Sequence, residues 1–571
     1  MKQLSTLTAR VQRTLPADLI AYAVAANGIA LILLTLPAER FLRRELHIRL
    51  HHLSMSVVGP SVTLFLAVSL LYLSFHLIRR KRTAWLVAVG GYSLVLLSNV
   101  VRLPLAESIL HHLSKYAFER LFVGIIFPIV LLAGLGLYRE QFTVKSDVRS
   151  FGLSLRFTVL ILGVALIYGM SGFLLMDKRD FHEEIGVGEA IHRTIDQFGL
   201  TTSGSLVPHT RRAKVFLDSL SVISVSAVGY AVVALFQPIR MRFTEQAASR
   251  EKARELLERH PASSEDFFKL WPHDKLYFFN EARSAGLAYR AHRGIALVVG
   301  DPFGDRRAYD SLLGAFDELC FTNDWSPAFV HTEPEYSELY KRHDFSLQKI
   351  GEEAILNIEH FRSSTVSNKY FRQIRNKFTK QQYRTEILMP PHSDALMRRL
   401  HQISQEWLAQ PGRTERGFMM GYFTPRYMDA CPIMVLRDAA GTIQGFVNQI
   451  LSFDKEEANF DLLRNTRESL GNSNDFLLVQ FIDYIHQQGF KRLNLGLCPL
   501  AGLTGHDEDR SVVDNALRFV YANGDRFYSF SGLHRFKAKY EPEWQSRYIA
   551  YRGGIGQFTR VLNDLNRAMR V

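Results

Sequence analysis

Residues 157–176 read FTVLILGVALIYGMSGFLLM, twenty consecutive positions without a charged side chain. An α-helix needs about 20 apolar residues to cross the hydrocarbon core of a bilayer. Six such runs in one half of the chain leave no polar faces for the helices of a soluble core. We therefore expect residues 1–242 to form a membrane α-helical bundle of about six spans. The other five runs are Leu19–Ala38, Leu50–Ile78, Thr83–Val101, Leu121–Tyr138 and Ser219–Ile239.

The charge pattern orients this bundle only in part. With six spans both ends of the chain lie on one side, and the basic turn Arg79-Arg80-Lys81-Arg82 favours the cytoplasm for that side. Other basic residues would then lie outside, so this pattern leaves the orientation open. They are Arg40, Arg43, Arg44, Arg49, Arg211, Arg212 and Lys214.

Composition bounds the rest of the chain. Its 571 residues are too many for one compact domain, and 47% hydrophobic content excludes disorder and collagen. The net charge of +13, from 69 basic and 56 acidic residues, predicts a polyanionic partner such as nucleic acid or anionic lipid. Cys320, Cys431 and Cys498 share no metal-binding spacing and build no disulfide framework. We expect no metal and no cofactor.

The chain beyond the membrane half alternates strand-like and helical patterns. A charged helix is predicted from Phe243 to about Pro261, and two cycles of strands and helices follow it. This pattern predicts an α/β layer built twice, with subdomains at 263–390 and 391–552, a linker at 243–262 and a tail at 553–571. The first cycle has strands at Leu276–Phe279, Ala288–Arg290, Ala296–Val299 and Ala328–His331, and a helix at Ser311–Cys320. The second has strands at Ile433–Arg437, Ile443–Leu451, Ala458–Leu463 and Arg492–Leu497, and a helix at Asp475–Gln488.

Between the cycles lies a basic and aromatic stretch, FRSSTVSNKYFRQIRNKFTKQQYR, at residues 361–384. Cations bind phosphates and aromatic rings stack on unpaired bases, so this composition is typical of RNA-binding surfaces. A solvated amphipathic helix is the alternative. The predicted tRNA-binding residues are Lys369, Arg372, Arg375, Lys377 and Lys380.

Many short motifs in a single order resemble the aminoacyl-phosphatidylglycerol synthases, the multiple peptide resistance factor family. The likeness runs from about Phe157 to Ala550. In the membrane half it rests on Leu175-Met-Asp-Lys-Arg-Asp-Phe181, Leu206-Val-Pro-His-Thr-Arg-Arg-Ala213 and Phe216-Leu-Asp-Ser219. In the second half it rests on Gly300-Asp301-Pro302-x-Gly304, Lys349-Ile-Gly-Glu352-Glu353-Ala354, Asn376, Pro390-Pro-His-Ser393, Glu406-Trp407, Gly417-Phe418, Asp461-Leu-Leu-Arg464, Asn494-Leu-Gly496-x-x-Pro499-Leu500, Arg526-Phe-Tyr528 and Arg535-Phe-Lys537.

This resemblance implies a tandem acetyltransferase-like (GNAT-like) domain facing the cytoplasm of a bacterium, anchored by a multi-pass membrane domain. It implies transfer of lysine, or next alanine, from aminoacyl-tRNA to phosphatidylglycerol. The cationic lipid product lowers the negative charge of the membrane and confers resistance to cationic antimicrobial peptides. The additional N-terminal spans that form a flippase in full-length members find no counterpart here, so we expect synthesis without flipping. A second copy, bound through the membrane domain, is a further expected partner.

The expected reaction is an ester exchange, which needs positioned groups, a proton acceptor and cations for phosphates, but no ATP. Asp461 and Arg464 stand three apart at a strand end. We expect Asp461 to hold the substrate ammonium or accept the proton, and Arg464 to hold the lipid phosphate. Glu352 is assigned to the aminoacyl ammonium and Lys349 to phosphate, because both flank a glycine. Arg535 and Lys537 match a basic run of the family near its end.

Two other functions stay open at this point. A membrane-tethered acyltransferase using acyl-coenzyme A would share the fold, and a non-catalytic membrane protein could bind tRNA or lipid through the same domain. Arg283-Ser-Ala-Gly286-Leu-Ala288 fits the pyrophosphate loop of coenzyme A-dependent enzymes. Such a loop must lead into a helix N-terminus, and the residues that follow predict a strand. Cys498 is expected to be a packed thiol.

Overall fold

The structure, a computed structural model, divides into two compact units near Ile239. Several stretches of the sequence analysis lie outside the described residues, including 33–59, most of 176–185, 197–208 and Arg526–Tyr528. The first two membrane-half motifs of the resemblance are therefore described only in part. The described residues are 17–32, 60–101, 125–144, 148–175, 181, 186–196, 209–236, 247–292, 294–502 and 530–570.

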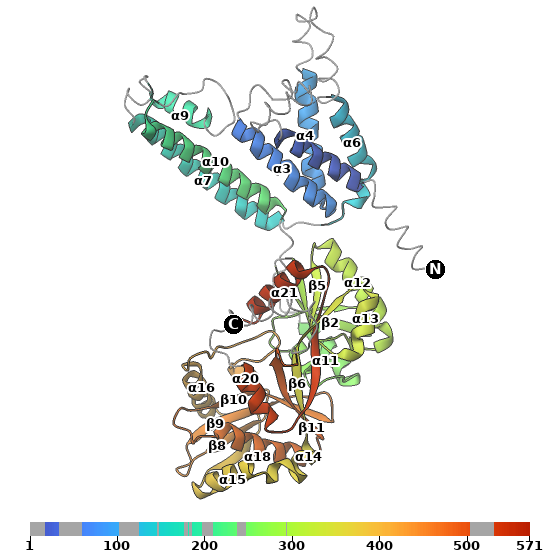
Figure 1. Cartoon of the computed structure of the whole chain (residues 1–571), viewed down its shortest axis with the longest axis vertical. Helices are drawn as coiled ribbons and strands as arrows, with labels where there is room; N and C mark the ends of the chain where they lie inside the picture. Colours follow the sequence, from blue (N-terminus) through green and yellow to red (C-terminus); the bar gives the residue numbers. More distant parts are fainter. Residues whose placement is uncertain are drawn as a thin grey trace, which may run out of the picture. The chain divides into compact units, whose positions relative to one another are not determined.

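The N-terminal unit is helical (Figure 1). One apolar cluster joins the helix at Ala17–Ile32 to α3, α4 and α6, and a second joins α7, α9 and α10. Aliphatic side chains also point outward from these helices: Leu94 of α4 is 68% exposed and Leu160 of α7 is 61% exposed. Exposed apolar surface of this extent is typical of helices that face lipid. The bounds are α3 (Pro60–Ile78), α4 (Arg82–Val101), α6 (Phe127–Leu137), α7 (Val148–Leu175), α9 (Val187–Ile195) and α10 (Arg211–Leu235), with a 3₁₀ turn at Arg139–Gln141.

The number of membrane spans differs from the prediction. Within the described ranges, two helical segments are long and apolar enough to cross a membrane, Arg82–Val100 and Thr158–Leu175. Three further apolar stretches, at Ala17–Ile32, Leu66–Ile78 and Phe127–Leu137, are shorter, although α3 as a whole covers Pro60–Ile78. The described residues therefore show two such segments and not about six. Parts of the expected runs Leu19–Ala38, Leu50–Ile78, Leu121–Tyr138 and Ser219–Ile239 lie outside the described residues.

The C-terminal unit is built around one mixed sheet with helices on both faces (Figure 1). Its strands are β1 (Leu276–Phe279), β2 (Ala285–His292), β3 (Ile295–Val299), β4 (Phe303–Gly304), β5 (Ser326–Thr332), β6 (Ser346–Asn357), β7 (Arg384–Leu388), β8 (Ile433–Arg437), β9 (Ile443–Ile450), β10 (Glu457–Asn465), β11 (Arg492–Pro499) and β12 (Glu543–Tyr551). Its helices are α11 (Ala247–Arg259), α12 (Tyr309–Thr322), α13 (Ser337–Arg342), α14 (Ile358–Ser363), α15 (Lys369–Lys380), α16 (Asp394–Leu408), α17 (Pro425–Met428), α18 (Ser473–Gln487), α20 (Phe530–Ala538) and α21 (Ile555–Ala568).

The strand order shows that the two predicted cycles share one sheet. It runs β1-β2-β3-β5-β12-β6-β11-β10-β9-β8-β7, with β4 paired to β2. Each cycle contributes one parallel pair, β3 with β5 and β10 with β11. β6 of the first cycle and β12 of the second cross to the other cycle, since β6 pairs with β11 and β12 pairs with β5. β7, which also precedes residue 390, pairs with β8 of the second cycle. The two cycles are thus joined by exchanged central strands that pair with each other.

The helices pack on both faces of this sheet. In the first cycle, α12 and α13 cover one face and α21 the other, so the expected C-terminal tail contains a packed helix. On the strands of the second cycle, α14, α15 and α18 cover one face and α16 and α17 the other, so α14 and α15 pack with the second cycle although they precede the expected boundary at 390. Figure 1 shows α15 and α18 together, in yellow and orange. Their contact includes the stacked rings of Phe378 and Phe476, whose centroids lie 4.4 Å apart.

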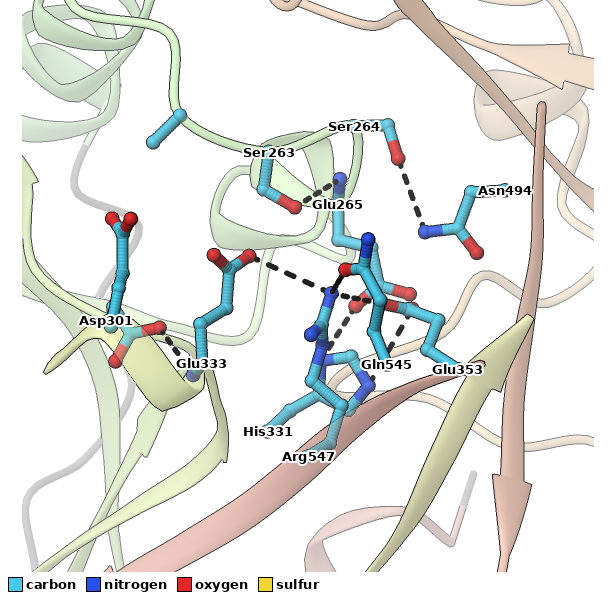
Figure 2. Close-up of polar contacts among 12 residues, drawn as sticks. Ser263, Ser264, Glu265, Asp301, His331, Glu333, Glu353, Asn494, Gln545 and Arg547 are labelled. Atoms are coloured by element: carbon cyan, nitrogen blue, oxygen red, sulfur yellow. Dashed lines mark hydrogen bonds and ion pairs between the residues drawn. The ribbon is translucent and has the colours of Figure 1, made fainter. Parts of the chain in front are cut away.

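Charged side chains fill the centre of the sheet where the cycles exchange strands (Figure 2). Glu353 of β6 is fully buried, and its carboxylate forms an ion pair with Arg547 of β12. On the other side of the Arg547 guanidinium lies Glu333, 3.7 Å away. His331, at the end of β5, places Nδ1 2.8 Å from Glu265 and Nε2 3.7 Å from Glu353. This network ties both exchanged strands to the segment that precedes β1.

We predict that Arg547→Ala lowers the free energy of unfolding by about 3–5 kcal/mol, because it leaves the Glu353 carboxylate buried without its cation. The control is Lys341→Ala, which breaks an ion pair whose side chains are 59% and 75% exposed. That loss is expected to stay below about 1 kcal/mol. Urea titration of the purified full chain measures both values. Equal losses for the two variants would contradict a stabilising role of the buried pair.

Candidate active site

In the second cycle, the strands β10 and β11 pair over only part of their length and then separate. Their parallel pairing covers Glu457–Asn459 against Arg492–Asn494, and beyond it each strand stays paired only with its other neighbour. Both strands carry an irregularity there, between Phe460 and Leu463 in β10 and between Asn494 and Leu497 in β11. Bulges of this kind redirect side chains and are common beside active sites. Asp461 follows the last pair on β10, and Gly496 follows it on β11.

Asp461 lies in a close-fitting cradle. Its Oδ2 accepts a hydrogen bond of 2.6 Å from the hydroxyl of Tyr427 in α17, and the backbone N–H of Gly421 donates a second. A Cβ at position 421 would overlap both Oδ2 of Asp461 and the ring of Tyr427, so only glycine fits there. Asp461 as a whole residue is half-buried. The orientation of its carboxylate is set by these two donors.

The ionisation of Asp461 is tuned by opposing effects. Burial raises the pKa of its carboxyl to about 7, while the Tyr427 hydrogen bond and the charge of Arg464 act in the lowering direction. A general base works best when its pKa lies near the operating pH. Asp461 thus has the electrostatic properties that the predicted proton-accepting role requires.

Arg464 is buried and already engaged. Its two terminal nitrogens bind the carboxylate of Glu415 at 2.9 and 2.8 Å, one of them also donates to the Ser404 hydroxyl, and its guanidinium lies 4.8 Å from the Trp407 ring centroid. A two-pronged Arg–carboxylate pair is a strong and orienting contact. In this structure Arg464 therefore holds the loop that carries Glu415 and Gly421, rather than presenting free donors to a lipid phosphate.

The other predicted site residues gather around β6 and the end of β11. Lys349 and Glu352 form an ion pair of 2.6 Å, and Lys349 also donates to the carbonyl of Gly502. Lys537 of α20 is 7% exposed and donates to the carbonyl of Leu497 at 3.1 Å. Burial lowers the pKa of the Lys537 ammonium. The predicted residues therefore lie in two groups, one on β10 and the other on β6 and α20 beside the end of β11.

Two neighbours of this second group have different surroundings. Arg535 lies on the exposed side of α20. Cys498 is buried, and burial raises the pKa of its thiol, so it is the packed cysteine that we expected.

Helix α15 carries the predicted tRNA-binding residues on its outer face. Phe371, Ile374 and Phe378 face the core. The five basic residues Lys369, Arg372, Arg375, Lys377 and Lys380 are all exposed. Lys377 donates to the carbonyl of Gly471, and within the described part of the chain the other four form no ion pair. An uncompensated row of cations of this kind suits a polyanion.

One cluster has the residue types of a metal site. Atoms of Glu265, His331 and Glu353 lie within 4.8 Å of one another. The two ring nitrogens of His331 face different carboxylates, however, so one ion cannot bind all three groups through the same nitrogen. The facing carboxylates outweigh burial and raise the pKa of His331, which favours an imidazolium here. The geometry supports an ion-pair network rather than a metal centre.

The comparisons with known proteins cover both halves of the chain. The family described as "Phosphatidylglycerol lysyltransferase, C-terminal" matches residues 254–551, and "Transmembrane region of lysyl-tRNA synthetase" matches residues 13–177. The first match spans more than half of the sequence. The chain belongs to the phosphatidylglycerol lysyltransferase family.

Relatives and solved structures are similar to about half of the chain. The phosphatidylglycerol lysyltransferase of Bacillus subtilis is 32% identical over 285 residues, 49% of this chain and 32% of that protein. The Staphylococcus aureus enzyme is 30% identical over 300 residues, 52% of this chain and 35% of that protein. The chain therefore matches about a third of the length of these lysyltransferases.

The L-PGS structure from Bacillus licheniformis aligns with a TM-score of 0.51 and 27% identity, over 57% of this chain and 98% of that one. A DUF2156 C-terminal domain from Agrobacterium fabrum aligns with a TM-score of 0.50 and 26% identity, over 57% and 97%.

Sequence reasoning missed Tyr427, Gly421 and Glu415. These residues contact Asp461 and Arg464, which it had selected. They come from a loop and a short helix without a recognisable motif, and only the fold brings them to β10. Gly417-Phe418, which we had matched to the family, was the nearest signal.

If the Arg464–Glu415 pair holds the loop, Glu415→Gln will loosen it around the trypsin sites Arg413 and Arg416. Arg413 is already exposed, so the expected change is local unfolding of the loop, which makes its backbone cleavable. We predict that cleavage there becomes about tenfold faster, because a charge-assisted hydrogen bond contributes about 1.5–3 kcal/mol. Limited trypsin digestion of the full chain with mass spectrometry measures the rate. Glu386→Gln, which breaks the more exposed pair with Arg437, is the control. Unchanged cleavage in Glu415→Gln would show that this pair does not restrain the loop.

Proposed function

We propose that this chain transfers an amino acid, lysine first and alanine next, from aminoacyl-tRNA to a hydroxyl of phosphatidylglycerol. The observation that carries the proposal is Asp461, an oriented carboxylate whose pKa is raised by burial to about 7, set in a domain of the lysyltransferase family. The product would be a cationic lipid that lowers membrane negative charge and protects against cationic antimicrobial peptides.

The proposed reaction places a lipid hydroxyl against the ester that joins the amino acid to tRNA ribose. The hydroxyl oxygen attacks the carbonyl carbon, Asp461 accepts the hydroxyl proton, and the ribose oxygen leaves with a proton. Aligning two bound substrates in this way replaces a bimolecular encounter by a positioned one. The Lys349–Glu352 pair of β6 and Lys537 of α20, which lie beside β11, are proposed to bind the phosphate and ammonium groups of the substrates.

The exposed cations of α15 are proposed to bind the tRNA backbone. They stand on a helix whose opposite face is fixed in the core by Phe371, Ile374 and Phe378, so the cations are held on a rigid surface. Phosphate contacts of this kind give affinity without sequence preference. A surface that binds tRNA phosphates and lies apart from the site of the reaction fits an enzyme that reacts only with the aminoacylated end of its tRNA.

The helical N-terminal unit is proposed to anchor this domain in the bacterial cell membrane as a multi-pass bundle, with the C-terminal unit in the cytoplasm, where aminoacyl-tRNA is made. The support is the match of residues 13–177 to a transmembrane-region family, together with the two long apolar segments. Contact with a second copy through these helices remains part of this proposal.

The coenzyme A alternative is weakened by the fold. The segment Arg283–Ala288 leads directly into β2, which begins at Ala285, and not into a helix N-terminus. Free N–H groups at a helix start are what bind the pyrophosphate of coenzyme A in such loops. The sequence match is therefore not accompanied by the structure that the chemistry needs.

The decisive experiment is lipid chromatography of cells expressing the full chain, fed labelled lysine and labelled alanine in parallel. We expect a labelled basic lipid, and we expect RNase treatment of isolated membranes to reduce its synthesis to background. Asp461→Asn is the matched inactive control, since it keeps the side-chain size and removes the charge. Synthesis that survives RNase and depends on added acyl-coenzyme A would favour the acyltransferase instead.

A second test addresses α15. Replacing Lys369, Arg372, Arg375 and Lys377 by alanine should flatten the dependence of log affinity on log salt by about 0.7–0.9 per lost phosphate contact. The effect should be the same for every tRNA tested. The control removes the same charge at four exposed positions elsewhere, Lys341, Arg342, Lys455 and Lys491. An equal change in both variants would mean that only net charge matters and that α15 is a solvated face.

A further inference from the structure

We propose that Tyr427 is a positioning residue that sets the ionisation of Asp461 and thereby the pH range in which the site works. This inference rests on the proposed function, and extends it by naming what controls the carboxylate. Tyr427 was not selected by any sequence pattern, and its ring makes no contact that the transfer chemistry itself needs.

The position of Tyr427 is fixed on every side. Helix α17 begins after Thr424, whose hydroxyl accepts a hydrogen bond from the backbone N–H of Tyr427, and Pro425 occupies the first turn. The Tyr427 ring is 2% exposed and packs against the rings of Phe267 and Trp271, with centroids 6.1 and 5.7 Å away. The hydroxyl therefore cannot turn away from Asp461 without disturbing this cluster.

The hydroxyl of Tyr427 acts as a permanent donor to Asp461. Burial and the neighbouring carboxylate raise the pKa of Tyr427 well above its ordinary value, so it keeps its proton throughout the pH range of a cell. A donor that cannot lose its proton stabilises the ionised form of the acceptor. The 2.6 Å bond to Oδ2 therefore counteracts burial, which alone would keep Asp461 protonated and unable to accept a proton.

The same cradle explains the glycine at position 421. Its backbone N–H provides the second donor to Asp461, and the lack of a Cβ allows the Tyr427 ring to approach. Charges facing Asp461 come from Arg464 of the same strand and from Glu415 of the loop; they act in opposite directions on its pKa, and the lowering effect of Arg464 is the larger. Tyr427 is thus the neutral group with the largest lowering effect on the pKa of Asp461.

The test is Tyr427→Phe in the full chain, which removes one oxygen and keeps the packed ring. Loss of the donor raises the pKa of Asp461, so the rising limb of the pH–rate profile should move up by about one pH unit. At pH 7 turnover should then fall about fivefold, and raising the pH should restore it towards the wild-type plateau. Recovery at high pH separates a shift in ionisation from structural damage.

The matched control is Tyr340→Phe. It removes a buried tyrosine hydroxyl that donates to Asp301 at 2.7 Å in the first cycle, and so costs comparable stability. Its pH–rate profile should keep the wild-type limb. A Tyr427→Phe profile with an unmoved limb, whether or not its plateau is lower, overturns the inference.

A second readout does not require activity. Infrared difference spectra against pH follow the protonated carboxyl band of Asp461 as the part that Asp461→Asn removes from the spectrum of each variant, because burial also raises the pKa of Asp301 and of Glu353 to about 7. We expect the midpoint to rise in Tyr427→Phe and not in Tyr340→Phe, and equal midpoints overturn the inference. A wild-type chain without transfer activity would contradict the proposed function, while these spectra would still decide whether Tyr427 controls Asp461.

Discussion

The ion pair between Glu353 and Arg547 holds the centre of the C-terminal unit together. It joins β6 to β12, the two strands that each cycle contributes to the other, and it is shielded from water on both faces of the sheet. A buried carboxylate without its cation would cost several kcal/mol, so the pairing of these strands and the pairing of these charges require each other. His331, Glu265 and Glu333 extend this constraint to the segments on either side.

The pairing of β6 with β12 also positions the candidate site. Because β6 pairs with β11 on one side of the sheet and β9 pairs with β10 on the other, the two parallel strands can separate after Asn459 and Asn494 without losing all their partners. Asp461 then lies on one strand of the separated pair, and the carbonyl bound by Lys537 lies on the other. The chemistry that we propose uses the parallel pair β10–β11 at the point where its pairing ends.

The sequence assigned both Asp461 and Arg464 to the substrate site, but the fold gives them different surroundings. Asp461 and Arg464 stand three positions apart, yet Asp461 remains half-exposed while Arg464 is buried against Trp407 and Glu415. The irregularity in β10 separates their environments. Arg464 thus supports the loop that brings Gly421 to Asp461, and a loss of function in an Arg464 variant could arise from that loop as well as from a missing phosphate contact.

The sequence by itself determined the two-part organisation, most strands of both cycles, the amphipathic helix of residues 369–380 and the family likeness. Those features depend on local periodicity, on uncharged runs and on short motifs. Each of these can be read from a single stretch of the sequence. Only the tertiary structure decided the exchange of β6 and β12, because these strands carry Lys349, Glu352, Glu353 and Arg547 and lack the alternation that marks a half-buried strand. Their charges are compatible with burial only when residues almost 200 positions apart in sequence meet, as Glu353 and Arg547 do. The surroundings of Asp461 could not be predicted from the sequence for the same reason, since Gly421 and Tyr427 contact a carboxylate that the fold alone brings to them.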